Sequence, residues 1–121
     1  MNQRQKFTEL LTEEMRQNED IILLVGDVGY KVFDHLREEC PDRVINPGAA
    51  EQLMIGMAAG LAMDGKIPVC YSITPFVLYR PFEFIRNYVN HEKIPVRQCP
   101  LFTPYSTRFT LKSSNAFKFD F

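Results

Sequence analysis

The chain lacks an excess of charge of either sign. Its 121 residues include 14 Lys and Arg and 15 Asp and Glu, which gives a formal net charge of -1 at pH 7. Proteins that bind nucleic acid or an anionic membrane surface present clustered basic residues, and the sequence contains no such cluster. We therefore expect neither nucleic acid nor a membrane among the partners.

Long apolar runs are also missing. The longest apolar stretch, residues 53–63, is interrupted by glycine and is too short to span a bilayer. Residues 1–6 are mostly polar, unlike a secretory signal, which continues from a basic start into an apolar run. With 45% hydrophobic and 24% charged residues, the chain has the composition of one globular domain, and we expect a cytoplasmic location.

Cysteine and histidine are scarce, and their spacing excludes common uses. The three cysteines, Cys40, Cys70 and Cys99, form no CxxC pair and no spacing typical of a metal site. His35 and His91 stand far apart in the sequence, so each is interpreted as a surface or hydrogen-bonded histidine rather than a ligand. We expect buried free thiols, a reducing compartment and no metal ligands.

Phosphate-binding glycine motifs are absent as well. The segment Gly-Asp-Val-Gly at residues 26–29 lacks the third glycine and the spacing of a dinucleotide fingerprint, and it is not a P-loop. Val28 also stands where a magnesium-diphosphate Gly-Asp-Gly motif has its second glycine. The sequence therefore predicts no diphosphate-binding loop of its own.

The sequence does contain an alternation of helical and extended patterns. Helical spacing of apolar residues predicts helices at residues 7–15, 32–37, 49–63 and 79–89. Branched apolar runs predict strands at residues 21–25, 43–46 and 67–72, with another strand beginning at 94–96. Such alternation predicts an α/β fold of three layers, in which helices flank a mostly parallel sheet.

This pattern ends after Val96. Residues 97–121 contain no glycine, show no helical period and are rich in Phe, Ser and Thr. We therefore expect a domain over residues 1–96 that is incomplete on its C-terminal side. Residues 97–121 are expected to form a divergent, poorly ordered tail.

Glu51 is the first candidate for a chemical role. It stands in the first turn of a helix that is otherwise almost entirely apolar. The helix N-terminus favours the ionised carboxylate, whereas desolvation favours the neutral acid, and this competition suits a group that shares a proton. The alternative is that Glu51 only caps the free amides of its helix, which is the commoner use of such a residue.

Three aromatic residues form a second candidate feature. Phe76, Tyr79 and Phe82 recur at intervals of three after a predicted strand end, where ligands of open α/β sheets usually bind. A flat aromatic ligand could stack on such rings. The alternative is ordinary packing in the core.

Residues 41–96 resemble the pyrimidine-binding domain of transketolase and its relatives, which include deoxyxylulose-phosphate synthase. The resemblance rests on the run PDRVINPGAAEQLMIGMAAGLAMDGKIPVCYSITPFVLYRPFEFIRNYVNHEKIPV, and the upstream IILLVGDVG resembles the first strand of that domain. It implies a thiamine diphosphate-binding fold of the pyrimidine-domain type. The implied activity is ketol transfer between sugar phosphates with thiamine diphosphate and Mg²⁺.

The resemblance also assigns residues. It implies that Glu51 hydrogen-bonds N1′ of the aminopyrimidine and so activates the cofactor. It implies an aromatic wall against the pyrimidine ring, formed by Phe76, Tyr79 and Phe82. It also implies that Asp27 and Gly29 line the entrance for cofactor and substrate. Arg80 matches an arginine of the synthase branch.

The departures from the family pattern predict a dependence on a partner. In the family a second domain with a Gly-Asp-Gly motif holds the diphosphate and its Mg²⁺, and this chain has no such motif. We expect a diphosphate-domain subunit, a homodimer or both, with no turnover by the chain alone. The loss of resemblance after Val96 suggests a frameshift, a mis-called exon or a truncated copy. The alternatives are a non-catalytic remnant or interaction protein, or a fragment of the synthase or dehydrogenase branch.

Overall fold

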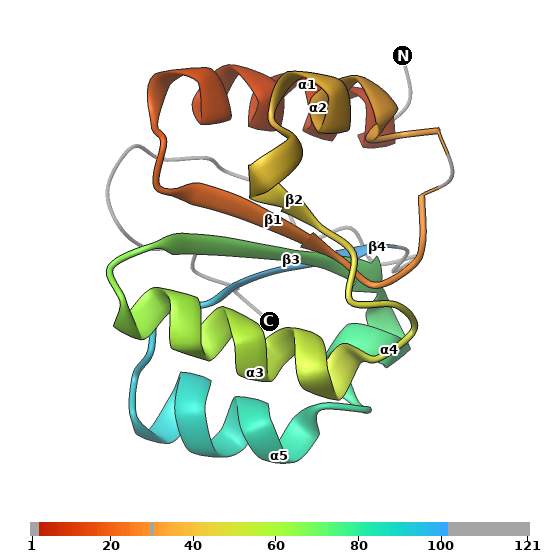
Figure 1. Cartoon of the computed structure of the whole chain (residues 1–121). Helices are drawn as coiled ribbons and strands as arrows, with labels where there is room; N and C mark the ends of the chain where they lie inside the picture. Colours follow the sequence, from red (N-terminus) through yellow and green to blue (C-terminus); the bar gives the residue numbers. More distant parts are fainter. Residues whose placement is uncertain (1–2, 30, 102–121) are drawn as a thin grey trace.

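The computed structural model describes residues 3–29 and 31–101, which form three layers (Figure 1). The helices α1 (Gln3–Gln17) and α2 (Asp34–Glu39) cover one face of a sheet. Among the described residues, four helical segments lie on the side of the opposite face: α3 (Glu51–Met63), α4 (Thr74–Leu78), α5 (Phe82–Phe84) and η2 (Ile85–His91). This arrangement confirms the predicted α/β fold with helices on both sides of the sheet.

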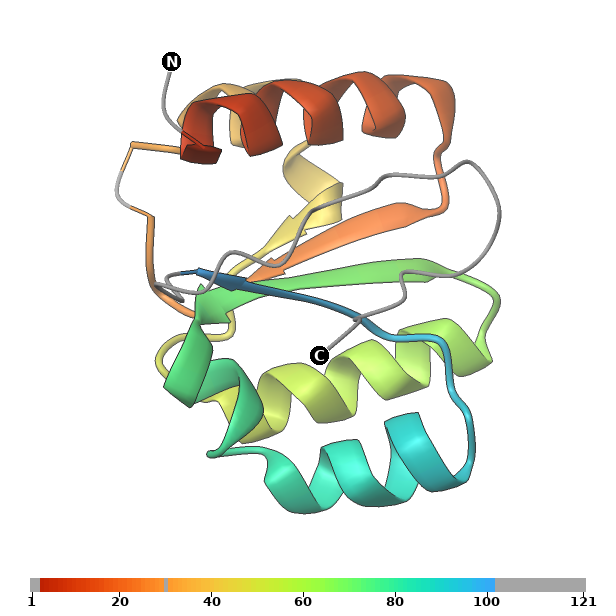
Figure 2. The ribbon, with the colours of Figure 1, turned by 180° about the vertical axis from the view of Figure 1, so that it is seen from behind.

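The sheet has four strands in the order β2-β1-β3-β4, and every neighbouring pair is parallel. Its strands are β1 (Ile21–Val25), β2 (Val44–Ile45), β3 (Ile67–Ile73) and β4 (Arg97–Leu101). Figure 2 shows β4 at the edge opposite to β2. Because all strands run the same way, their carboxyl ends meet at one edge of the sheet, the usual place for a ligand in open α/β folds.

The two faces of the sheet carry separate apolar cores. Successive strand residues point to opposite faces, so Leu23 packs with the α1 and α2 layer while Leu24 packs with α3. All five residues of β1 are buried, as expected for a parallel strand covered on both faces. In the α3 layer, Met54, Ile55 and Ala58 are fully buried against the sheet.

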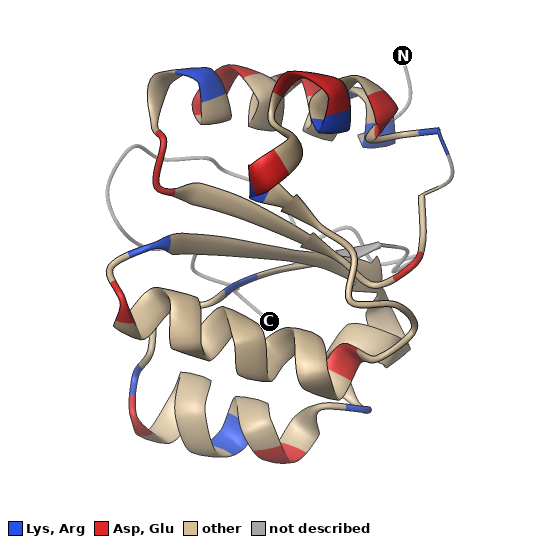
Figure 3. Ribbon diagram, in the orientation of Figure 1, with Lys and Arg blue, Asp and Glu red and all other residues tan. Residues whose placement is uncertain are grey.

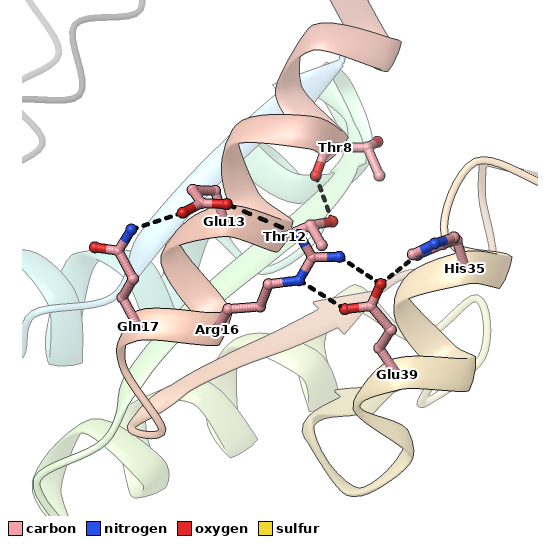
Figure 4. A network of polar contacts seen from close by, with 7 residues as sticks. All are labelled: Thr8, Thr12, Glu13, Arg16, Gln17, His35 and Glu39. Carbon is pink, nitrogen blue, oxygen red and sulfur yellow. Dashed lines mark hydrogen bonds and ion pairs between the residues drawn. The ribbon is translucent and has the colours of Figure 1, made fainter.

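Charged residues gather on the α1 and α2 layer, whereas the ribbon from α3 to η2 carries few (Figure 3). Arg16 on α1 donates two hydrogen bonds to the carboxylate of Glu39 on α2, with N–O distances of 2.9 Å from Nε and 2.7 Å from NH2. Nδ1 of His35 lies 2.9 Å from the same carboxylate, and Glu13 lies 3.8 Å from Arg16 (Figure 4). This cluster fastens α2 to α1 from the solvent side.

Two elements differ from their predicted positions. The helix predicted at residues 79–89 begins later, at Phe82, because residues 79–81 form a turn around Pro81 that separates α4 from α5. Proline disfavours helical geometry in the preceding residue and removes a backbone donor. The strand expected to begin at residues 94–96 begins instead at Arg97.

The sheet thus extends into the segment predicted to be a divergent tail. Residues 97–101 form β4, which pairs with β3 along its length. The rest of that segment, residues 102–121, lies outside the described residues, and the domain boundary after Val96 stays a prediction. In the part of the chain that is described, no helix combines the length and the apolar character needed to cross a membrane.

The cysteines are free thiols, as predicted. Cys70 and Cys99 are buried and Cys40 is half-buried. Burial raises the pKa of the Cys70 thiol and raises that of Cys99 to about 12. Both buried thiols are therefore held in the neutral form at physiological pH.

Candidate functional site

Glu51 is the first residue of α3 and is only 2% exposed. The helix begins there because Ala50, the preceding residue, has left helical backbone angles, and the apolar residues that follow pack on the sheet. The carboxylate is therefore held inside the protein, and α3 begins near the edge of the sheet where the strands end (Figure 1).

Both carboxylate oxygens of Glu51 accept hydrogen bonds from side chains of other elements. The hydroxyl of Ser72, near the end of β3, donates to Oε1 across 3.0 Å. NH1 of Arg80 donates to Oε2 across 3.2 Å. These bonds differ from the capping alternative, in which the carboxylate would accept from the amides of its own helix.

The backbone of Gly26 closes the site from the side of β1. A Cβ atom at this position would lie 3.0 Å from the Ser72 hydroxyl and 3.2 Å from Oε1 of Glu51. The amide of Gly26 donates to the carbonyl of Tyr71 across 3.0 Å and so extends the pairing between β1 and β3. Glycine therefore fits where the chain leaves β1, since a side chain there would press on Ser72 and Glu51.

The three predicted aromatic residues occupy different environments. Phe76, in α4, is half-buried, and the guanidinium carbon of Arg80 lies 3.6 Å from its ring centroid. Arg80 therefore joins Phe76 to Glu51. Tyr79 and Phe82 are 75% and 59% exposed, respectively, so ordinary core packing does not account for these two rings.

The two predicted entrance residues lie beyond the end of β1. Asp27 is exposed, has a φ angle of 51°, and accepts a hydrogen bond across 3.1 Å from the side chain of Asn46. The Asn46 side chain also accepts from the amide of Gly48 across 2.9 Å, so it ties the two loops together. Gly29 has a φ angle of 79°, and a Cβ atom there would lie 3.1 Å from the ring of Phe33. The positive φ angle and the close approach of Phe33 therefore both favour glycine at position 29.

Sequence reasoning missed two members of this site, Ser72 and Asn46. Each had a weak signal: Ser72 is a polar residue at the carboxyl end of an apolar strand, and Asn46 lies directly after another strand. Within residues 3–29 and 31–101, no group of three or more His, Cys, Asp or Glu side chains could hold a metal ion.

The arrangement can accommodate a flat, nitrogen-bearing group. The guanidinium of Arg80 is itself planar, donates an N–H to Glu51 and lies over the ring of Phe76. Glu51 thus accepts a hydrogen bond from the edge of this planar group, and Phe76 packs against its face. An aminopyrimidine has the same two requirements, and the side chains around Glu51 fit it.

The parallel sheet is that of an open α/β domain. Its candidate ligand-binding site contains the buried Glu51, which lies where the strands end. The chain belongs to the transketolase family, since the family model for the transketolase pyrimidine binding domain matches residues 1–114. The structure has the parallel sheet and flanking helices expected of that domain.

Individual relatives agree with this assignment. The chain is 40% identical over 95 residues to a putative transketolase C-terminal section of Methanocaldococcus jannaschii, covering 78% of this chain and 30% of the relative. It is 35% identical over 94 residues to a 1-deoxy-D-xylulose-5-phosphate synthase of Gloeobacter violaceus, covering 77% of this chain and 15% of the relative.

A solved structure described as a split-gene transketolase, an inactive tetramer of beta chains, superposes with a TM-score of 0.73 at 33% identity. The match covers 80% of this chain and 32% of that one. The chain therefore spans about a third or less of the length of these relatives.

Proposed function

We propose that this chain binds the aminopyrimidine of thiamine diphosphate and takes part in ketol transfer between sugar phosphates. The observation that carries the proposal is the position of Glu51. Its buried carboxylate accepts hydrogen bonds from Ser72 and Arg80, and the guanidinium of Arg80 lies over the ring of Phe76. When bound, the cofactor supplies the electron sink that cleavage of a ketose requires.

The residues of this chain would place a proton and orient the ring. The hydroxyl of Ser72 fixes Oε1 of Glu51, which leaves Oε2 as the oxygen directed toward a ligand. Burial of Glu51 excludes water from the shared proton and strengthens its hydrogen bond to a ring nitrogen. Phe76 would support the face of the ring, as aromatic stacking requires.

The other predicted residues remain proposals. Tyr79 and Phe82 are exposed next to Arg80 in the sequence and could complete the wall once a cofactor or a partner covers them. Asp27 and Gly29 lie after the carboxyl end of β1 and would border the entrance.

A partner would supply the diphosphate and Mg²⁺ contacts. Relatives are named as sections or subunits of transketolases, and the layer from α3 to η2 exposes large apolar side chains that a partner could cover. These are Leu53, Met63, Tyr79, Phe82 and Tyr88. We propose a diphosphate-domain subunit as the partner, with a homodimer as the further assembly. The buried free thiols are consistent with a reducing, cytoplasmic location.

The test compares Glu51→Gln with Glu83→Gln, an exposed glutamate of α5. Each variant is mixed with the diphosphate-domain subunit, and thiamine diphosphate binding is measured by calorimetry. Ketol transfer and the synthase reaction are then assayed separately. We expect Glu51→Gln to lose turnover by at least about a hundredfold, as removal of a catalytic acid or base does, while Glu83→Gln retains it.

Unchanged turnover and binding in Glu51→Gln would show that the carboxylate has another role. The chain by itself should show no turnover, because its sequence has no Gly-Asp-Gly motif to hold the diphosphate and Mg²⁺. Ketol transfer by the isolated chain would contradict the need for a partner.

A further inference from the structure

Arg80 contacts both of the groups that define the candidate site. Its NH1 lies 3.2 Å from Oε2 of Glu51, and its guanidinium carbon lies 3.6 Å from the ring centroid of Phe76. The Glu51 side chain is 1% exposed and that of Arg80 is 49% exposed. The carboxylate is therefore fixed inside the protein, whereas the arginine reaches it from the surface.

These contacts compensate a charge that is costly to bury. An ionised carboxylate inside a protein requires a counter-charge or several hydrogen bonds. Ser72 provides one donor to Oε1, and Arg80 provides the donor and positive charge for Oε2. The stacking of a guanidinium on an aromatic ring adds a further attraction.

The guanidinium and an aminopyrimidine would use the same two protein groups, although the guanidinium donates an N–H to Oε2 whereas a ring nitrogen would share a proton with the carboxyl group. Each is planar, each directs nitrogen atoms along its edge, and each has a face that stacks on an aromatic ring. The face of Phe76 that Arg80 covers cannot stack on a second planar group at the same time, and the guanidinium fills the space beside Oε2 of Glu51. Arg80 must therefore leave before a pyrimidine can take this position.

We infer that Arg80 is a built-in occupant of the pyrimidine position, which it holds in the ligand-free chain and vacates when the cofactor binds. This inference rests on the proposed function. The half-exposed side chain can turn outward into water without exposing the core. The turn around Pro81, which is fully buried, holds the backbone from which it extends. Competition of this kind weakens apparent affinity by the fraction of molecules in which the site is open.

Three variants test the inference through binding rather than activity. Arg80→Met removes both contacts, Arg80→Lys keeps the charge without the planar stack, and Arg86→Met changes an exposed arginine of η2 as a control. Calorimetry measures the affinity of each for thiamine diphosphate in the presence of the diphosphate-domain subunit. We expect Arg80→Met to bind about tenfold more tightly than wild type, Arg80→Lys to fall between them, and Arg86→Met to match wild type.

A ligand-free measurement checks the contact itself and the folding of the variants. Urea unfolding of Arg80→Met, Glu51→Gln and the double variant gives the coupling between the two side chains. We expect the single effects to be non-additive by about fivefold in the unfolding equilibrium constant.

Methylguanidinium at millimolar concentration should raise the melting temperature of Arg80→Ala more than that of wild type, and thiamine should compete with it.

The outcomes separate the two proposals. Cofactor binding by wild type with unchanged or weaker binding by Arg80→Met overturns the role of Arg80 and leaves the proposed function in place. Additive unfolding energies likewise overturn it, because the contact would then be absent in solution. Failure of every folded variant to bind thiamine diphosphate overturns the proposed function and the inference with it.

Discussion

Ser72 and Glu51 are joined by a hydrogen bond of 3.0 Å that runs from the end of β3 to the start of α3. Both side chains are buried, with exposures of 0% and 2%. The bond therefore connects the sheet to the α3 layer at the candidate site, where water cannot replace a missing partner.

Replacing Ser72 with Ala should destabilise the protein by about 1–3 kcal/mol, because Oε1 of Glu51 loses its donor inside the protein. Urea unfolding measures this change. Thr8→Ala is the control, since the Thr8 hydroxyl donates to a carbonyl of its own helix, that of Arg4, across 2.9 Å. Its effect should stay within about 0.5 kcal/mol. Equal effects of the two variants would contradict the structural importance of the Ser72 bond.

Two glycines should respond in opposite ways to alanine. Gly60 lies within α3 and a Cβ atom there would contact nothing within 4 Å, so Gly60→Ala should stabilise the fold by about 0.5–1 kcal/mol. Gly26→Ala should cost about 1–3 kcal/mol, because the new methyl group would press on Ser72 and Glu51. Thermal and urea unfolding report both values. A neutral Gly26→Ala would mean that the site is looser than described.

The contact between Arg16 and Glu39 should make stability depend on pH. The hydrogen bond from Arg16 lowers the pKa of Glu39, so the ionised form is favoured in the folded state. Its contribution is present above the unfolded pKa of about 4.3 and disappears as pH falls through the lower folded value.

The difference in melting temperature between wild type and Glu39→Gln should therefore shrink when pH is lowered from about 6 to about 3, across that unfolded pKa. At neutral pH the control Glu9→Gln should have a smaller effect, since Glu9 makes a single exposed contact of 3.7 Å with Lys6. A constant difference between wild type and Glu39→Gln across this pH range would disprove the linkage.

Exposed apolar residues of the α3 to η2 layer should contribute to association. Phe82→Ser should weaken binding to the diphosphate-domain subunit by about tenfold, because buried aromatic residues carry much of the energy of an interface. Leu10→Ser removes an exposed large apolar residue, 39% exposed against 59% for Phe82, from the α1 layer and should leave association unchanged. Sedimentation velocity measures both. A stronger effect of Leu10→Ser would place the interface on the other layer.

The three thiols should differ in reactivity. At pH 8 a disulfide reagent such as DTNB should label Cys40 rapidly, whereas Cys70 and Cys99 should react only after unfolding, because burial raises their pKa values. Cys40→Ser should abolish the rapid phase. Labelling of a second cysteine in the folded protein would show that the sheet opens locally.

Much of the fold follows from patterns along the sequence. The run at residues 21–25 coincides with β1 (Ile21–Val25), because a strand buried on both faces contains only apolar residues. The helix predicted at residues 79–89 begins at Phe82 instead, since the apolar spacing continues through Pro81 whereas proline interrupts the helical backbone there. The strand expected from residue 94 begins three residues later, because the amide of Val96 bonds to the carbonyl of Ile94 across 2.9 Å in a turn instead of pairing with β3.

The site was less accessible to sequence reasoning. Burial of Glu51 could be anticipated from the apolar helix that it begins, although its catalytic role stays a prediction. Its contacts with Ser72 and Gly26 could not be anticipated. They depend on the register that places Val25 opposite Tyr71, and no local pattern encodes which residues meet when two distant strands pair.

The hydrogen bond from the Gly26 amide to the Tyr71 carbonyl extends the pairing of strands that lie far apart in the chain. Contacts between such distant segments form slowly, because a long loop must close first. The candidate site is therefore expected to form late in folding, after β1 and β3 have paired. A cofactor bound at Glu51 would then stabilise a chain that has already folded, and it would not start the folding of the chain.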